Sequence, residues 1–281
     1  MPTPPVAPPS WEDIPVATWS EFNDKLHSHN MMPKTAGSGN HARSPFMFRG
    51  MSVATWELKT SLERLNSDIR VVERPLLRAF RKYARQGSVL GGSEWEVLAV
   101  AQHNGLPTRC LDWTSSPLVA AHFATAEREF IGQSGVIWCV NLEMWRNFTI
   151  TKDLLSLLES DLAWMFDVRL LKQKFDDLTA LDRTQADVPE MLLFFEPPSI
   201  DARIENQFGS LSMMNGPDKS HDSYLRHVAT KFPGMVVRFV IDAGAKQEIR
   251  DKLDQNNISE RMLFPGLPGL ADWLRRYYGK A

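Results

Sequence analysis

The chain has 281 residues, of which 43% are hydrophobic and 23% are charged. This composition excludes a globally disordered chain and supplies the core of one large domain or two small ones. The formal net charge is −2 at pH 7. The strong positive charge of a dedicated nucleic-acid-binding protein is therefore missing, although a local basic groove is compatible with the sequence.

Cysteine content and the first residues bear on the compartment. Cys110 and Cys139 are too few for a disulfide framework, and Cys139 lies in an apolar run typical of a buried strand. The first residues contain neither a basic leader nor an apolar stretch, and the chain has no run of about eighteen apolar residues. We therefore expect a cytoplasmic protein with no membrane partner.

Proline, glycine and serine mark the segments that lie outside regular elements. Residues 1–10 are rich in proline and predict a disordered tail, and residues 33–45 predict a flexible loop. The remainder, 11–281, is expected to fold as a single domain.

The spacing of apolar residues predicts both strands and helices. Strands are predicted over 46–48, 110–113, 135–142, 191–195 and 235–241. Helices are predicted over 19–26, 69–85, 118–129, most of 152–177, 244–253 and 269–278. Because these elements alternate irregularly, the sequence indicates an α+β fold with a mixed sheet and surrounding helices.

One further helix is marked at both ends. Ser93 is a suitable N-cap, Glu96 is its capping-box partner, and Gly105 ends the helix just beyond Gln102 and His103. Caps are also predicted at Ser115 or Ser116 ahead of Pro117, and at Ser199 or Asp201 ahead of a helix that holds Arg203 and Gln207.

The segment from Gln102 to Ser115 is unusually polar and cationic for a connection between two apolar helical patterns. Ordinary loops are short and built from Gly, Pro, Asn, Asp and Ser, whereas this one adds His, Arg, Gln and two Thr. Upstream, Arg49 and Gly50 follow a short apolar run, where a strand would finish. Catalysis or tight binding is the preferred interpretation of these two segments.

Both segments resemble the FRG-domain family. The triplet that names the family is matched by Phe48-Arg49-Gly50, and its longer motif by Gln102-His103-x-Gly105-x-Pro107-Thr108-Arg109-x-Leu111-Asp112-Trp113-Thr114. The resemblance continues in Arg203-Ile204-Glu205-Asn206-Gln207-Phe208-Gly209 and in the tail from Ile258 to Leu270. Membership of this family implies no particular reaction.

The same parts are more distantly similar to ADP-ribosyltransferases of the Arg-Ser-Glu class. The shared order is a strand ending in Arg-Gly, followed by a strand reading Thr114-Ser115-Ser116 that leads into a helix. The similarity implies an ADP-ribosyltransferase-like core with NAD as its substrate. In such a core Arg49 would hold the dinucleotide, and Thr114 and Ser115 would position the ribose on the nicotinamide side. Glu205 or Gln207 would be the late polar residue.

The chemistry of that reaction accounts for these residue types. Cleavage of the nicotinamide–ribose bond creates an oxocarbenium-like centre, so a nearby carboxylate stabilises charge that exists only in the transition state. A guanidinium suits the pyrophosphate because its planar fork bonds two oxygens. This chain reads Glu205-Asn206-Gln207 where the transferase pattern wants Gln/Glu-x-Glu. If Gln207 holds the place of the acid, the site would bind NAD without efficient transfer.

The complete set of candidate residues joins the motifs. Catalytic roles are predicted for Arg49, His103, Asp112, Thr114, Glu205 and Gln207. Contacts to NAD are predicted for Arg49, Gly50, Gln102, Thr108, Arg109, Thr114 and Ser115. No metal site is predicted, because His27, His29 and His41 have no carboxylate or Cys at ligand spacing.

Each of these residues also has a structural interpretation. Arg49 could pair with Asp112 and brace the end of a strand, because buried Arg is commonly paired. His103 suits a helix C-terminus through the helix dipole. Gln102, Thr108 and Arg109 could form a polar network with His103 that only rigidifies the fold. The joint occurrence of the residues favours function.

Three functions therefore stay open. The preferred one is an NAD-dependent ADP-ribosyltransferase, a toxin or phage-defence effector that modifies a protein or nucleic acid and could have an antitoxin or another partner protein. The second is a hydrolase or nuclease, which requires His103 and Asp112 within hydrogen-bond distance of each other. The third is a module that binds a nucleotide or a partner without catalysis.

Overall fold

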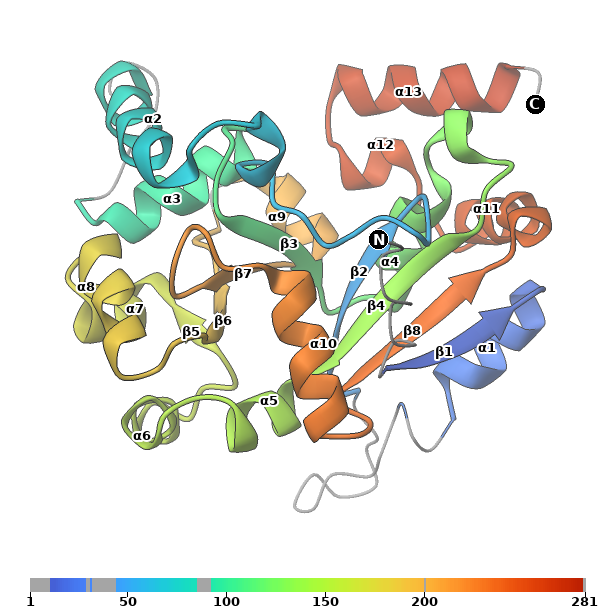
Figure 1. Ribbon diagram of the computed structural model, residues 1–281. Coiled ribbons are helices and arrows are strands. Elements are labelled where there is room, and N and C mark those ends of the chain that lie inside the picture. The colour runs from blue at the N-terminus through green and yellow to red at the C-terminus, as the bar shows by residue number, and fades with distance from the viewer. Residues whose placement is uncertain (1–10, 29–30, 32–43, 85–91, 200, 280–281) are drawn as a thin grey trace, which may run out of the picture.

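The computed structural model describes the chain apart from residues 1–10, 29–30, 32–43, 85–91, 200 and 280–281 (Figure 1). The tail predicted over 1–10 and nearly all of the loop predicted over 33–45 lie outside the described residues. No helix in the described part is long and apolar enough to cross a membrane.

Among the described residues, eight strands form one sheet in the order β1-β8-β4-β2-β3-β7-β6-β5. The strands are β1 (Glu12–Val16), β2 (Phe46–Met51), β3 (Cys110–Thr114), β4 (Gly135–Asn141), β5 (Phe166–Asp167), β6 (Leu192–Glu196), β7 (Gly209–Met214) and β8 (Val236–Ile241). The pairs β1–β8 and β5–β6 are parallel and the others are antiparallel. The sheet is therefore mixed, and the α+β prediction is confirmed.

The sheet nearly separates into two halves between β2 and β3. Phe48 and Thr114 form the single residue pair in the described register of these two strands. By contrast, β2 pairs with β4 along its whole length, from Phe46 to Met51, and β3 pairs with β7 from Cys110 to Thr114. Beyond that one pair the two strands diverge, as Figure 1 shows.

Helices cover both faces of the sheet (Figure 1). Those before β6 are α1 (Trp19–Leu26), α2 (Ile69–Ala84), α3 (Glu94–His103), α4 (Pro117–Thr125), α5 (Leu142–Phe148), α6 (Lys152–Ser160), α7 (Val168–Lys174) and α8 (Leu178–Arg183). Those after β6 are α9 (Ala202–Gln207), α10 (His221–Lys231), α11 (Lys246–Gln255), α12 (Glu260–Leu263) and α13 (Leu267–Tyr278).

Strand alternation divides the buried residues between the two faces. Phe48, Ile137 and Phe239 belong to a core cluster with residues of α1, α4 and α11. Their neighbours along the strands, such as Met47 and Trp138, belong to a second cluster on the other face. Successive side chains of a strand point to opposite faces, so near-continuous apolar strands can build both cores.

Several predicted boundaries were wrong. The helix predicted over 118–129 ends at Thr125, and a 3-10 turn follows over Arg128–Phe130. The helical stretch predicted within 152–177 is divided into α6, β5 and α7. Leu162 has a positive φ of 54°, which a helix does not allow, and the Asp167 side chain caps α7 by accepting from Leu170 N. The apolar period continues through this break, so the spacing alone did not reveal it.

Close packing of α4 on β2 requires glycine at position 50. A Cβ at Gly50 would lie 1.9 Å from the carbonyl oxygen of Ala120 and 2.7 Å from the amide nitrogen of Ala124. Both obstacles are helix backbone, which cannot move aside as a flexible side chain can. Gly50 therefore brings β2 and its neighbour Arg49 against the helix that follows β3.

We predict that Gly50→Ala lowers the free energy of unfolding by about 3 kcal/mol or more, because overpacking here displaces a whole helix. Denaturant unfolding measures the change. The matched control is Gly132→Ala, where an added Cβ meets nothing within 4 Å, and we expect it to change stability by less than about 0.5 kcal/mol. Equal stability of the two variants would contradict this packing argument.

Candidate functional site

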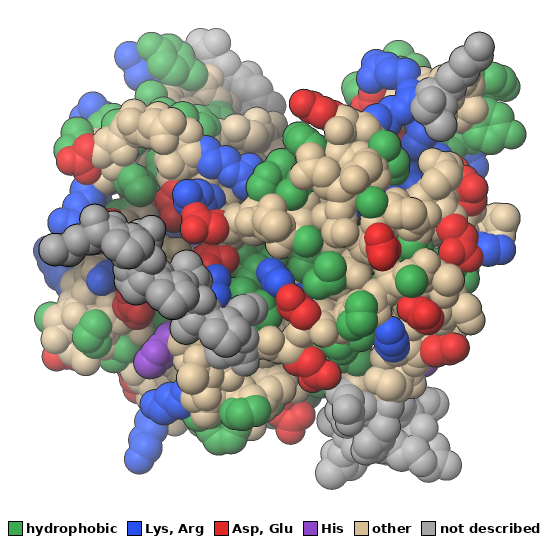
Figure 2. All heavy atoms as spheres, turned by 45° about the vertical axis from the view of Figure 1, so that its right-hand side comes forward, with side chains coloured by type: hydrophobic (Ala, Val, Ile, Leu, Met, Phe, Trp, Pro, Cys, Tyr) green, Lys and Arg blue, Asp and Glu red, His purple; other side chains and the backbone are tan. Residues whose placement is uncertain are grey.

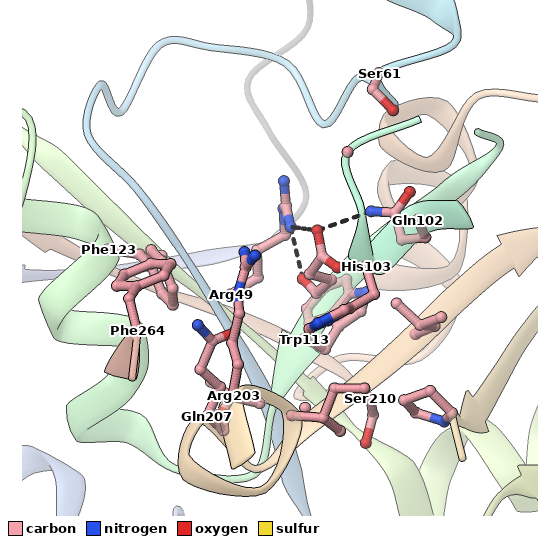
Figure 3. A pocket seen from close by; sticks show the side chains of 18 of the residues that line it. Arg49, Ser61, Gln102, His103, Trp113, Phe123, Arg203, Gln207, Ser210 and Phe264 are labelled. Carbon is pink, nitrogen blue, oxygen red and sulfur yellow. Dashed lines mark hydrogen bonds and ion pairs between the residues drawn. The ribbon is translucent and has the colours of Figure 1, made fainter. Parts of the chain in front are cut away.

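A cleft of about 990 Å³ opens where β2 and β3 separate. Arg49 and Thr114 line it from the two strands. The end of α3 and Ser61 line one side, and Phe123 and Phe264 line the other (Figure 3). Trp56 and Arg64 also line the cleft, and α9 contributes Arg203 and Gln207. In Figure 3, Arg49 rises between the side of Phe123 and Phe264 and the side of Gln102 and His103. The cleft therefore has an aromatic side and a polar side.

Arg49 reaches across the gap between the two strands. Its Nη1 donates to the backbone oxygen of Asp112 at 2.6 Å and lies 4.0 Å from the Asp112 carboxylate. Burial lowers the pKa of Arg49, and the Asp112 charge opposes that shift. Its Nε is buried and has no hydrogen-bond partner among the described residues. The bracing contact with Asp112 is thus present, yet the guanidinium keeps donors for a ligand.

A chain of hydrogen bonds orients Asp112. Thr108 donates its hydroxyl to Gln102 Oε1, and Gln102 Nε2 donates to Asp112 Oδ2 at 2.9 Å. The bond from Thr108 fixes which end of the Gln102 amide faces the carboxylate. The Asp112 side chain is still 66% exposed. It is therefore a held carboxylate that remains open to the cleft.

Arg109 and Thr108 do not line the cleft. Arg109 is buried and donates to Glu73 Oε1 and to Asp182 Oδ1, both at 2.6 Å. Burial lowers the pKa of Arg109, but hydrogen bonds and charge from Glu73 and Asp182 outweigh it and raise the pKa. These contacts attach the start of β3 to α2 and α8. The structure thus places Arg109 behind the site, where it supports the loop.

His103 joins the polar side of the cleft to α9. Its Nε2 lies 2.7 Å from Asp201 Oδ2. Asp201 also caps α9, because its Oδ1 accepts from the backbone nitrogens of Arg203 and Ile204 at 2.9 and 3.3 Å. Among the described residues, no hydrogen bond joins His103 to Asp112, so the pair required by the hydrolase alternative is not formed.

Thr114 connects β3 with the end of α9. Its hydroxyl donates to the backbone oxygen of Gln207 at 2.7 Å and accepts from Ser116 N at 3.0 Å. The chain leaves α9 through Phe208 at a φ of 48°, which turns the Gln207 carbonyl toward Thr114. Ser115 is exposed and lies outside the cleft.

The late acidic position is not filled by an acid. Gln207 lines the cleft, and its Nε2 donates to Leu263 O at 2.9 Å. Glu205 is exposed and lies outside the cleft. Among the described residues, the carboxylates that line the cleft are Asp112, Asp201 and Glu127.

Residues 44–130 match the family model of the FRG domain. This segment is similar to the FRG domain. The match runs from β2 through α4 and includes Arg49, the 102–115 motif and Gly50. No curated protein and no solved structure matches the chain. The family resemblance is therefore confirmed for this segment, whereas α9 and Phe264 complete the cleft from outside it.

Sequence reasoning assigned no role to several residues that line the cleft beside the FRG segment's motif. These are Trp56, Ser61, Arg64, Phe123, Glu127, Arg203, Ser210 and Phe264. Arg203 and Phe264 were marked by the segments that resemble the family, but nothing local distinguishes the others, because they are brought together by the fold. No group of three His, Cys, Asp or Glu residues suited to a metal ion occurs within the described residues.

The distribution of charged side chains in Figure 2 distinguishes a long polyanion from a small anionic ligand. Lys and Arg side chains are interspersed with Asp and Glu over this face and do not gather into one broad basic patch. A long polyanion would need such a patch for affinity. A small anionic ligand needs only the few cations inside the cleft.

His221 at the start of α10 is buried near Arg49. Neither ring nitrogen makes a hydrogen bond of good geometry among the described residues, although an interaction with the backbone of Ser212 opposes the lowering of its pKa. Burial lowers the pKa of His221 to about 3, and the Arg49 charge adds to the effect. His221 is therefore neutral at pH 7 and adds no charge to that of Arg49.

The depressed pKa makes stability depend on pH. Between pH 6.5 and about 3 the unfolded chain binds a proton at His221 that the folded chain does not. Stability is therefore lost as the pH falls through this window, by about 1.4 kcal/mol per pH unit for this histidine. We predict that His221→Leu reduces the loss measured by urea unfolding between pH 6.5 and 5.

The matched control is His227→Gln, because His227 is an exposed residue of the same helix. We expect the control to keep the pH dependence of the wild type. An unchanged slope in His221→Leu would contradict the account of His221.

Proposed function

We propose that the cleft binds NAD and that the protein is an NAD-dependent ADP-ribosyltransferase. The observation that carries this proposal is the meeting of Arg49, Thr114 and Gln207 at one cleft. They are far apart in the sequence, and the Phe48–Thr114 pair and the Thr114–Gln207 hydrogen bond bring them together. These are the positions to which the resemblance assigned the NAD-holding cation, the ribose-side hydroxyl and the late polar residue.

The size of the cleft supports a dinucleotide. Ligand pockets typically measure about 300–1,000 Å³, and this cleft of about 990 Å³ is at the upper end of that range. Arg49 lies between the two sides, where it can bond the pyrophosphate while each ring system extends to one side. A guanidinium forms paired hydrogen bonds to such oxygens.

Asp112 is our proposed catalytic carboxylate. Asp112 lies on β3, and the hydrogen bond from Gln102 holds its carboxylate in place. The carboxylate lies next to Arg49 and is exposed to the cleft. In the reaction the bond between nicotinamide and ribose C1′ breaks, nicotinamide leaves with the bonding electrons, and an acceptor nucleophile bonds to C1′ and releases its proton. A fixed carboxylate stabilises the cationic centre between these two events.

The acceptor in this proposal is a protein or a nucleic acid, as expected for a toxin or phage-defence effector. The charge pattern in Figure 2 favours a protein over a long nucleic acid on the face it shows.

One observation favours a non-catalytic nucleotide-binding module as the second candidate. Glu205 is outside the cleft, and the Gln207 amide is held by Leu263. If Asp112 does not replace the missing acid, the cleft would hold NAD without cleaving it. Binding and turnover must therefore be measured separately.

We predict that the wild type binds NAD in calorimetric titration and releases nicotinamide, and that Arg49→Ala loses both. Removal of the charged hydrogen bonds to the pyrophosphate should weaken binding at least about tenfold. Circular dichroism checks that the variant is folded. A folded Arg49→Ala protein with full binding and release would exclude this role for Arg49.

We further predict that Asp112→Asn keeps NAD binding within about threefold, because the amide fills the same space, and lowers nicotinamide release about a hundredfold or more. Glu205→Gln is the control and should leave both quantities unchanged. Loss of release in Glu205→Gln alone would move the catalytic acid to Glu205. Binding without release in the wild type would favour the non-catalytic module.

A further inference from the structure

Besides Arg49, two arginines line the cleft, and neither has a carboxylate partner among the described residues: Arg64 is exposed to solvent, whereas Arg203 is half-buried. Arg203 stands in the first turn of α9, and its Nε is buried without a hydrogen-bond partner. Within the described part of the chain, its side chain makes no hydrogen bond or ion pair. Its guanidinium carbon lies 5.0 Å from the ring centre of Phe264. Asp201, two residues before it, is bonded to His103, and Glu205, two residues after it, is exposed and makes no ion pair with it among the described residues.

This arrangement differs from that of four other arginines that are buried or half-buried. Arg109 pairs with Glu73 and Asp182, and Arg238 pairs with Asp13. Arg250 pairs with Glu260, and Arg276 pairs with Asp254 and Glu260. A half-buried guanidinium without an anion loses hydration that nothing in the protein replaces. An anionic ligand would supply what Arg203 lacks.

The aromatic side of the cleft holds Arg203 in place. Phe264 meets Phe123 edge to face with ring centres 6.1 Å apart. The chain before Phe264 is fixed to α9, because Asn206 and Gln207 donate to the backbone oxygens of Met262 and Leu263 at 2.7 and 2.9 Å. Stacking on Phe264 occupies the face of the guanidinium and leaves its N–H edge free for oxygen atoms.

A ligand that pairs with the Arg203 guanidinium and also packs on the aromatic wall has phosphate oxygens next to a planar ring. Arg49 and Arg203 reach the cleft from different elements, β2 and α9 (Figure 3). Two guanidinium groups suit two linked phosphates, and the half-buried rings of Phe123 and Phe264 suit a nucleobase.

We propose that Arg203 and the Phe123–Phe264 wall form a subsite for a nucleoside diphosphate, with the phosphates shared between Arg203 and Arg49 and the base against the aromatic rings. In NAD this moiety is the ADP half, and the polar side at Gln102 and Asp112 then receives the nicotinamide ribose. The orientation of NAD rests on the proposed function. The subsite itself does not.

The test is calorimetric titration with ADP, inorganic pyrophosphate and adenosine. The wild type binds ADP more tightly than it binds pyrophosphate or adenosine, because only ADP contacts both the guanidinium groups and the aromatic wall. Arg203→Gln lowers the affinity for ADP and for pyrophosphate at least about tenfold, because a charged hydrogen bond is lost. Phe123→Leu removes a ring of the wall that lines the cleft but does not stack on Arg203, so it weakens the binding of ADP more than the binding of pyrophosphate. This second variant separates the two features and does not depend on the folding of the first.

Arg261→Gln is the matched control, because Arg261 stacks on Trp273 at 4.7 Å but does not line the cleft. Its ADP affinity stays that of the wild type. Arg203→Gln with wild-type ADP affinity, or a wild type that binds no ADP at millimolar concentration, overturns the subsite.

The subsite and the proposed function can fail separately. ADP binding that requires Arg203, in a protein that releases no nicotinamide from NAD, supports the subsite and removes the transferase. Nicotinamide release that requires Arg49, with equal ADP affinity in Arg203→Gln and the wild type, supports the transferase and overturns the subsite.

Discussion

The architecture depends on the near-separation of two central strands. Phe48 and Thr114 hold β2 and β3 together at one residue pair, and beyond it the backbone of each strand turns its free edge toward a cleft. Hydrogen-bonding groups at such an edge need partners. Arg49 supplies one by donating to the backbone oxygen of Asp112. The same side chain therefore bridges the two halves of the sheet and presents a cation to the cleft.

The walls of the cleft are fixed by polar contacts between distant segments. Arg109 ties the start of β3 to α2 and α8 through Glu73 and Asp182, and His103 ties α3 to the N-terminus of α9 through Asp201. Truncating Glu73 would leave the buried charge of Arg109 without its buried partner. Much of the polarity of the 102–115 motif therefore builds the walls of the cleft, while Arg49 and Asp112 line it.

Local signals predicted local structure well. The Ser93 cap accepts from Glu96 N as expected, and Gly105 has the positive φ that ends a helix. Strand β1 was missed because it contains Pro15 and charged residues, and β7 because its sequence is rich in serine. The aromatic side of the cleft could not be predicted, since Phe123 and Phe264 meet only through tertiary packing. Nor could the burial of Arg109, because its acidic partners lie far away in the sequence.

The most direct test of the account is a crystal structure of the protein with bound NAD or ADP-ribose. We predict nucleotide density in the opening between β2 and β3, with the diphosphate in contact with Arg49 and the nicotinamide-side ribose near Asp112 and Thr114. A nucleotide bound elsewhere on the protein, or an empty cleft in crystals saturated with NAD, would contradict it.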